Sequence, residues 1–292
     1  MNTEKIVKAG KIASQVKKFA RSFIKPKMPL LDIAEKIEAK IIELGGESAF
    51  PVNLSINNIA AHYTPSHDDK SLAHGLLKID LGVHVDGWIA DTAFSMDLEN
   101  SQENKKLIQA SEEALKSAEK ILKAGIHMNK IGGIIEKTIK SKGFSPIINL
   151  SGHEISQYEL HAGVSVPNID DSRASILTPG LYAIEPFATN GSGKVHDGKP
   201  SGIYMLRASQ APRNPGARKL LDFIVKKYNT LPFCSRWIVK KFGAKSLFDL
   251  KILENNGNLH HFAQLTESEN AIVSQAENTV LIGKEIIVTS AD

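Results

Sequence analysis

The sequence predicts a mixed α/β fold made of two related halves, with a helical segment inserted before the last strands. Three observations lead to this prediction. A helix–helix–strand order occurs twice along the 292 residues. Residues 78–94 alternate between apolar and polar side chains in the manner of a strand pair. Residues 206–268 differ from both halves, because they are rich in lysine and have a helical pattern.

The first half begins with two predicted helices. An apolar stripe at helical spacing covers residues 3–23, and Pro26 ends it because proline lacks an amide proton. A second stripe covers residues 31–44 and is closed by Gly45 and Gly46. A loop-rich stretch over residues 49–65 then leads into the predicted strand pair.

The second half repeats this order, with predicted helices over about residues 103–123 and 129–141. Strand-like segments follow in SPIINLSGHEI and LYAIEPFA, and two further strands joined around Gly283 end the chain. This order suggests a duplicated unit, although the halves share too little identity to prove it.

The inserted segment is expected to contain a helix over residues 215–228. We therefore divide the chain into one main domain, residues 1–205 with 269–292, and a helical subdomain, residues 206–268.

The strand pair has the sequence KIDLGVHVDGWIADTAF, residues 78–94. Asp86 and Gly87 form a strong two-residue turn signal, because both residue types tolerate positive φ angles. This turn would pair 82 with 91 and 80 with 93. One face of the hairpin is then a core face, with residues 79, 81, 83, 85, 88, 90, 92 and 94.

The other face carries Asp80 and Asp91 as diagonal neighbours, together with the small residues Gly82 and Ala93. Two carboxylates so close should raise one pKa strongly unless a cation lies between them. The alternative, two solvated aspartates on an open sheet face, is equally compatible with the pattern. The pair by itself favours a site for hard cations.

Composition restricts the class of protein. A hydrophobic content of 42% allows a substantial core, and the net charge of +4 does not by itself indicate nucleic-acid binding. With Cys234 as the single cysteine, neither an intrachain disulfide nor a cysteine zinc site is possible. We expect a cytoplasmic protein, because no apolar stretch approaches the length of a membrane span or a signal peptide.

Lysines concentrate in the first 27 residues and around residues 226–251. Solvated helix faces explain them best, and docking on the ribosome is the less favoured alternative. We expect no membrane and no DNA partner.

Three further polar residues stand in apolar surroundings: His153, Glu185 and Glu277. Each alone is explained as readily by a structural role. Combined with Asp80 and Asp91, they form a ligand set suited to a dinuclear Mn, Fe, Co or Zn centre. Two metals allow a bridging water to ionise near neutral pH and attack a carbonyl.

Several motifs together resemble the type 2 methionine aminopeptidases, in the short form found in archaea. They are AFPVNLSIN, AAHYTP, KIDLGVHVDGWIADTAF, NLSGH, LHAG and IEPFATNGSG. The resemblance covers residues 1–290 and is densest between 45 and 205. It implies the pita-bread fold, with a metal site between two related α/β halves, and it identifies residues 206–268 as the type 2 helical insert.

The resemblance also implies a role for each ligand. Asp80 would bind one metal and Asp91 both, while His153 and Glu185 would bind the other metal and Glu277 would bridge. The implied cofactor is thus two divalent ions.

The implied reaction is removal of an N-terminal methionine that precedes a small residue, by attack of a metal-bridging hydroxide. Glu185 would move the proton, and His62 and His161 would contact the substrate as hydrogen-bond donors. Phe50 and Leu160 are candidates for the methionine pocket, although core packing explains each equally well. The partner would be a nascent protein N-terminus, and the family implies a monomer.

One motif departs from the family pattern, at Ala276 and Asn278. Relatives usually read Phe-Glu-His-Thr, whereas this chain has Ala276, Glu277, Asn278 and Thr279. Asparagine can donate and accept hydrogen bonds but cannot become cationic. Because outer-shell changes weaken metal binding by about 10- to 100-fold, metal affinity and preference stay open.

Two rival functions remain. The first is an Xaa-Pro aminopeptidase or prolidase-like enzyme of the same fold, which shares a similar ligand set but fits AAHYTP and the insert poorly. The second is a non-catalytic relative that binds RNA or protein, which the complete ligand set disfavours.

Overall fold

The computed structural model describes residues 1–172 and 175–291. Its helices are α1 Thr3–Phe23, α2 Leu30–Glu43, α3 Gln102–Glu119, α4 Met128–Ser141, α5 Pro215–Tyr228, α6 Ser235–Phe242 and α7 Ser246–Asn255. The four predicted helices of the two halves are thus present, and α5 has the predicted bounds. Among the described residues, no helix is both long and apolar enough to cross a membrane.

The strands form three sheets. In chain order they are β1 Glu47–Ile56, β2 Ile59–Ala61, β3 Leu76–Val85, β4 Trp88–Asp97, β5 Ser145–Pro146, β6 Ser151–Ile155, β7 Ser165–Pro167, β8 Gly180–Ile184, β9 Phe187–Thr189, β10 His196–Leu206, β11 Phe233–Cys234, β12 Leu259–Thr266, β13 Val273–Gln275, β14 Glu277–Ile282 and β15 Ile286–Val288.

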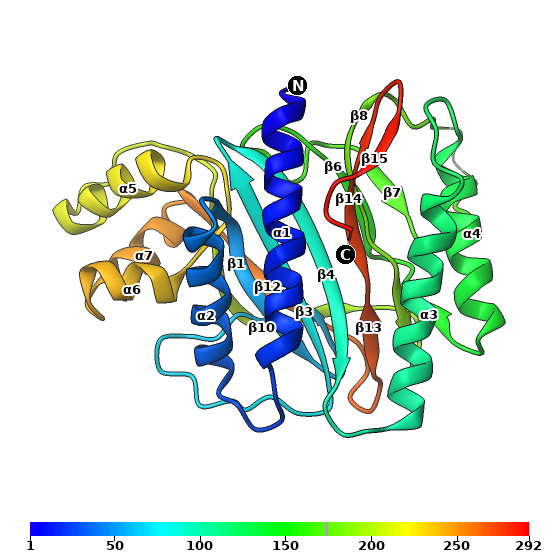
Figure 1. Ribbon diagram of the computed structural model, residues 1–292. Helices are drawn as coiled ribbons and strands as arrows, with labels where there is room; N and C mark the ends of the chain where they lie inside the picture. Colours follow the sequence, from blue (N-terminus) through cyan, green and yellow to red (C-terminus); the bar gives the residue numbers. More distant parts are fainter. Residues whose placement is uncertain (173–174, 292) are drawn as a thin grey trace.

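The main sheet joins the two halves through a strand from the end of the chain. Its order is β1-β3-β4-β14-β8-β6-β7, with β15 paired to β14. The C-terminal strand β14 therefore lies between β4 of the first half and β8 of the second (Figure 1). Residues that are far apart in the sequence become neighbours across this strand.

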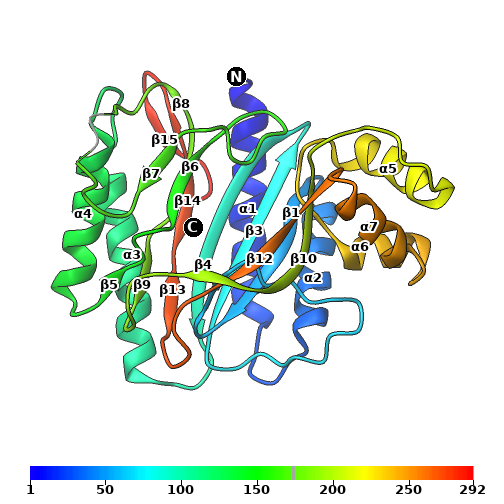
Figure 2. The same ribbon diagram turned by 180° about the vertical axis from the view of Figure 1, so that it is seen from behind.

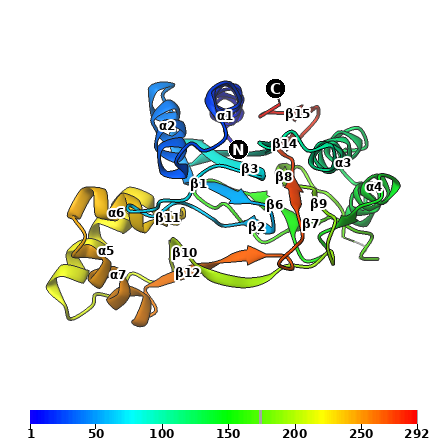
Figure 3. The same ribbon diagram turned by 90° about the horizontal axis from the view of Figure 1, so that it is seen from below.

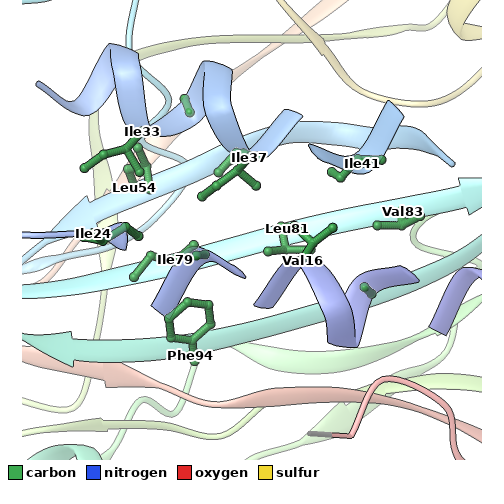
Figure 4. Packing of buried hydrophobic residues seen from close by; sticks show 14 of the residues in the cluster. Val16, Ile24, Ile33, Ile37, Ile41, Leu54, Ile79, Leu81, Val83 and Phe94 are labelled. Carbon is green, nitrogen blue, oxygen red and sulfur yellow. The ribbon is translucent and has the colours of Figure 1, made fainter. Parts of the chain in front are cut away.

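Helices cover one face of the main sheet. Helices α1 and α2 lie over β1, β3 and β4, and α3 and α4 lie over the second half (Figures 1 and 3). Figure 4 shows the first of these layers, in which Ile37 of α2 and Val16 of α1 pack with Ile79 and Leu81 of β3. These side chains are fully buried, so the apolar stripes of both helices pack on the core face of the hairpin.

The hairpin has the predicted register. Gly82 pairs with Asp91 and Asp80 with Ala93, and the turn residues Asp86 and Gly87 have φ angles of 50° and 80°. The core-face prediction is confirmed for Ile79, Leu81, Val83 and the partly buried Val85 on β3, and for Ala90 and Phe94 on β4. Trp88 is the exception: it is half-buried beside Ile89 in a different cluster, next to the turn.

A second layer faces the opposite side of the main sheet. Strands β10 and β12 pair along much of their length and join β2 and β11 in a four-stranded sheet (Figures 2 and 3). The segment between β10 and β12 contains α5, α6 and α7, which have their own apolar core. This agrees with a helical insert, and its limits at 206 and 268 remain a prediction.

A buried ion pair ties the inserted helices to the first half. Arg236 of α6 donates to both carboxylate oxygens of Glu38 on α2, at 2.7 and 2.8 Å. Trp237 Nε1 donates to the same carboxylate at 2.9 Å. Because both charged residues are buried, this contact is part of the packed interface between the insert and α2.

Candidate active site

Two rows of paired residues cross the main sheet and carry the predicted ligands. In the first row Asn53, Asp80, Ala93 and Glu277 are successive partners on β1, β3, β4 and β14. Directly paired residues project to the same face of a sheet. Continuing the pairing of Asn278 with Ile184 by one position brings Glu185 opposite Glu277. Three carboxylates of the first row therefore share one face.

The second row supplies the other two ligands. Phe50 pairs with Gly82, and Gly82 with Asp91. Thr279 of β14 pairs with Ala183 of β8, and Ala183 pairs with His153 of β6. Thr279 connects the Asp91 part of this row with the His153 part, since its Oγ1 receives a hydrogen bond from the Asp91 amide at 2.7 Å. Small residues separate the ligands and leave room between them.

The pKa values of the four buried carboxylates are all raised. Burial raises the pKa of Asp91 to about 7. Burial also raises the pKa of Asp80 well above its ordinary value, and the charge of Asp91 adds to this. The pKa values of Glu185 and Glu277 are raised well above the ordinary value as well, first by burial and then by the charges of the neighbouring carboxylates. The cluster is unfavourable when fully ionised, unless positive charge enters it.

His153 is oriented toward this cluster. Its Nδ1 faces the backbone carbonyl of Glu154 at 3.4 Å, and its Nε2 lies 3.6 Å from Oδ2 of Asp91. Burial lowers the pKa of His153 to about 4, so the ring is neutral at pH 7. A neutral imidazole with its proton on Nδ1 presents the Nε2 lone pair, which is the form that binds metals.

The donor set fits divalent cations. One ligand atom each from Asp91, His153 and Glu277 lies within 4.8 Å of the others. Among the predicted ligands, four buried oxygens have no hydrogen-bond partner in the described part of the chain: Asp80 Oδ1, Asp91 Oδ1, Glu277 Oε1 and Glu277 Oε2. Buried oxygens without donors are costly. Cations coordinated by these oxygens would remove both this cost and the mutual repulsion.

A cavity of about 350 Å³ opens on this group. Its lining includes eight of the nine residues that the sequence predicted for the site: Phe50, His62, Asp80, Asp91, His153, Leu160, His161 and Glu185. Glu277 is outside the lining, but its carboxylate interacts electrostatically with those of Asp91, Glu185 and Asp80. Phe262, Ile203 and Leu265 of the β10–β12 layer close the opposite wall.

Two further histidines stand in the cavity wall. The rings of His161 and His153 are 4.3 Å apart. The pKa of His161 is lowered to about 3, first by burial and then by electrostatic repulsion from His153 and His62. His62 Nδ1 lies 3.1 Å from the carbonyl oxygen of Ala263, and burial lowers its pKa also. Because a carbonyl only accepts, Nδ1 of His62 carries the proton and its Nε2 is an acceptor.

The chain matches metallopeptidase family M24 over residues 4–227. A methionine aminopeptidase of Pyrococcus abyssi is 43% identical over the full length of both chains. That of Methanocaldococcus jannaschii is 47% identical and aligns with 96% of this chain and 95% of its own. The chain belongs to metallopeptidase family M24.

Solved structures show the M24 fold independently of sequence. A methionine aminopeptidase from Thermotoga maritima matches 99% of this chain and 96% of its own, with a TM-score of 0.70 at 19% identity. A thermophilic Arx1 matches with a TM-score of 0.85 at 17% identity. A prolidase from Pyrococcus furiosus matches with a TM-score of 0.62. The expected pita-bread fold is therefore confirmed.

Asn278, which departs from the Phe-Glu-His-Thr pattern, lies behind the site, on the helix side of the sheet. Asn278 Nδ2 donates to Glu119 Oε1 at 2.8 Å, and its Oδ1 receives a hydrogen bond from Lys17 Nζ at 3.3 Å. Lys17 also donates to Thr92, the neighbour of Asp91. A lysine cation thus lies beside the asparagine, which itself cannot carry charge.

Two residues of the site were not predicted from the sequence. Gln275 Nε2 lies 3.5 Å from Asp80 Oδ2, and its hydrogen bonds partly offset the burial that raises the pKa of Asp80 and Glu185. Asn53 lines the cavity beside Asp80. Both are amides in buried strand segments, and that combination is the signal that could have identified them.

Proposed function

We propose that this M24 peptidase releases methionine from peptides and proteins whose second residue is small. The observation that carries the proposal is the gathering of Asp80, Asp91, His153, Glu185 and Glu277 around one cavity. The full-length methionine aminopeptidase relatives support the choice of methionine as the residue removed.

We assign two divalent ions to the carboxylates and His153, because four acidic groups exceed what one ion needs. When bound, these ions would supply a Lewis acid and a nucleophilic water ionised near neutral pH. Which of Co, Mn, Fe or Zn is bound follows from availability as much as from the ligands.

Glu185 is the residue that moves the proton. It lies at the end of β8, lines the cavity, and has a raised pKa because of burial and the nearby aspartates. A carboxylate with a raised pKa can accept a proton from the attacking water and pass it to the leaving amine.

The two histidines contribute differently. His161 is neutral, and an N–H directed into the cavity can stabilise the developing negative charge on the carbonyl oxygen. His62 holds its proton on Nδ1 toward Ala263, so its Nε2 accepts. We therefore propose that His62 receives a hydrogen bond from the N–H of the scissile amide, in place of the donor role that the resemblance implies.

Phe50 and Leu160 form the apolar wall that would hold the methionine side chain. Both are buried, line the cavity and belong to one apolar cluster. A thioether packs favourably against an aromatic ring, which suits Phe50.

The test compares two peptides as substrates. The protein is purified without oxygen, and its metal content is measured. Release of methionine from Met-Ala-Ser, with no cleavage of an Ala-Pro dipeptide, supports the proposal. Cleavage of Ala-Pro alone would establish an Xaa-Pro enzyme. Tight RNA binding at physiological salt, without hydrolysis by the metal-loaded protein, would establish a binding protein.

A further inference from the structure

We propose that Asn53 recognises the free amino group of the substrate, by accepting a hydrogen bond from it through Oδ1. This inference rests on the proposed function and adds a residue that determines specificity for an unblocked N-terminus. Asn53 would contribute to substrate choice and not to metal binding.

The position of Asn53 is the first argument. It pairs with Asp80 across β1 and β3, so both side chains project from the same face of the sheet. Both line the cavity, together with Phe50 and His62. A methionine held against Phe50, with its carbonyl near the histidines, brings its amino group to the Asp80 side of the cavity.

The hydrogen bonds of Asn53 are the second argument. Its Nδ2 donates to the carbonyl oxygen of Pro51 at 2.8 Å. Because a carbonyl cannot donate, this contact fixes the amide with Oδ1 pointing away from Pro51. Oδ1 is buried and has no hydrogen-bond partner among the residues that the structure describes. The oxygen therefore requires a donor.

The surroundings indicate what that donor is. Asp80, the neighbour across the strands, places its carboxylate oxygens on the same face of the sheet as Asn53. An amino group, which offers N–H donors, is complementary to such a group of oxygens. A blocked N-terminus has fewer donors and is bulkier, so it would be rejected.

Asn149 offers a matched control. It lines the same cavity, but both ends of its amide are satisfied by one residue. Its Nδ2 donates to the carbonyl oxygen of Val195 at 2.7 Å, and its Oδ1 receives the Val195 amide at 2.9 Å. Asn149→Leu therefore removes a structural amide from the cavity wall without removing a free acceptor.

The experiment compares two ligands with protein saturated with Mn²⁺. Calorimetry gives the dissociation constants of L-methionine and of 4-(methylthio)butanoic acid, which lacks the amino group. Wild-type protein should prefer methionine. Asn53→Leu should reduce this preference by about tenfold or more, as expected for a lost hydrogen bond from a charged donor. Asn53→Asp keeps an acceptor oxygen and should retain the preference.

Metal content and the control complete the test. Asn53→Leu should hold as much manganese as the wild type, and Asn149→Leu should keep the wild-type preference even if its stability falls. An unchanged preference in Asn53→Leu, or a loss of metal from it, overturns the inference. Should Asn53→Leu fail to fold, Asn53→Ala undergoes the same comparison. If the wild type releases no methionine from Met-Ala-Ser, the proposed function fails, irrespective of the variants.

Discussion

His153 Nε2 lies 3.6 Å from Asp91 Oδ2, although the two residues belong to different halves of the main sheet. Strand β14 connects them, since Thr279 bonds to Asp91 and lies in one row with His153. The contact therefore exists only when the two halves are correctly assembled. His153 is for this reason the first residue to mutate.

His153→Ala should lower metal content and methionine release together. Loss of an outer-shell partner costs about 10- to 100-fold in metal affinity, and loss of a ligand should cost more. Elemental analysis and a Met-Ala-Ser assay measure the two effects. His67→Ala, at an exposed loop position, is the control and should match the wild type. Full activity of His153→Ala would refute its assignment as a ligand.

His62→Ala should keep its metal and lose turnover. The ring contacts Ala263 and borders the cavity, and no ligand role is assigned to it. Removing a hydrogen bond made to the reacting amide should lower kcat by about 10²- to 10³-fold, as for other transition-state contacts. Elemental analysis of the same sample decides the point, because an emptied site would make His62 a ligand.

The metal-free protein should lose stability as the pH rises from about 6.5 to 8. Burial raises the pKa of Asp91 to about 7, and the pKa values of the other three carboxylates are raised as well. The folded state therefore binds more protons than the unfolded state, and this stabilisation disappears as the pH passes the folded pKa values.

The histidines act in the opposite direction at lower pH. The pKa of His153 is lowered to about 4, so its contribution to stability grows with pH until about 6.5 and is then constant. Thermal unfolding of chelator-treated protein should show a decrease of a few degrees between pH 6.5 and 8. Saturating Mn²⁺ should abolish the decrease, because metal-bound carboxylates stay ionised. A melting temperature that rises over this range without metal would contradict the raised pKa values.

Gly82→Ala should weaken methionine binding. A Cβ at position 82 would lie 2.3 Å from Cε1 of Phe50, so the ring must move within the cavity wall. We expect a higher KM for Met-Ala-Ser, with unchanged metal content. Gly133→Ala in α4, where the nearest atom would be 3.6 Å away, should leave KM unaltered. Equal KM values for both variants would exclude Phe50 from the methionine pocket.

Arg236→Met should destabilise the whole protein. It leaves the carboxylate of Glu38 buried without a cation, with the Trp237 indole and the Val52 amide as remaining donors, and breaking such a pair costs about 3–5 kcal/mol. Lys240→Met removes an exposed ion pair to Glu35 and should cost less than about 1 kcal/mol. Urea unfolding curves measure both. Similar values for the two variants would show that the insert does not depend on this contact.

Local features could be predicted from the sequence because they depend on neighbouring residues. The Asp86–Gly87 turn fixes the hairpin register, and the register places Asp80 and Asp91 on one face. The amphipathic patterns also predicted the apolar stripes of α1 and α2, and the structure shows where these stripes pack. Both inferences use the repeat of apolar side chains over a few residues, which can be read directly from the sequence.

The convergence of His153, Glu185 and Glu277 on the hairpin had another source. Their residue types suggested ligands, and the family resemblance suggested their roles, but no local pattern states that β14 enters the sheet between β4 and β8. Strand pairing across long stretches of sequence depends on the whole chain, because the pairing partners are not encoded by spacing.

The sequence by itself thus determined the helices, the hairpin register and the identity of the acidic pair. Only the tertiary structure decided that the proton of His62 faces Ala263 and that Lys17 lies next to Asn278. It also decided that Asn53 Oδ1, beside Asp80, has no hydrogen-bond partner among the described residues. The physical reason is that a polar atom's role depends on which donors and acceptors surround it, and those come from distant segments that only the packed fold brings together.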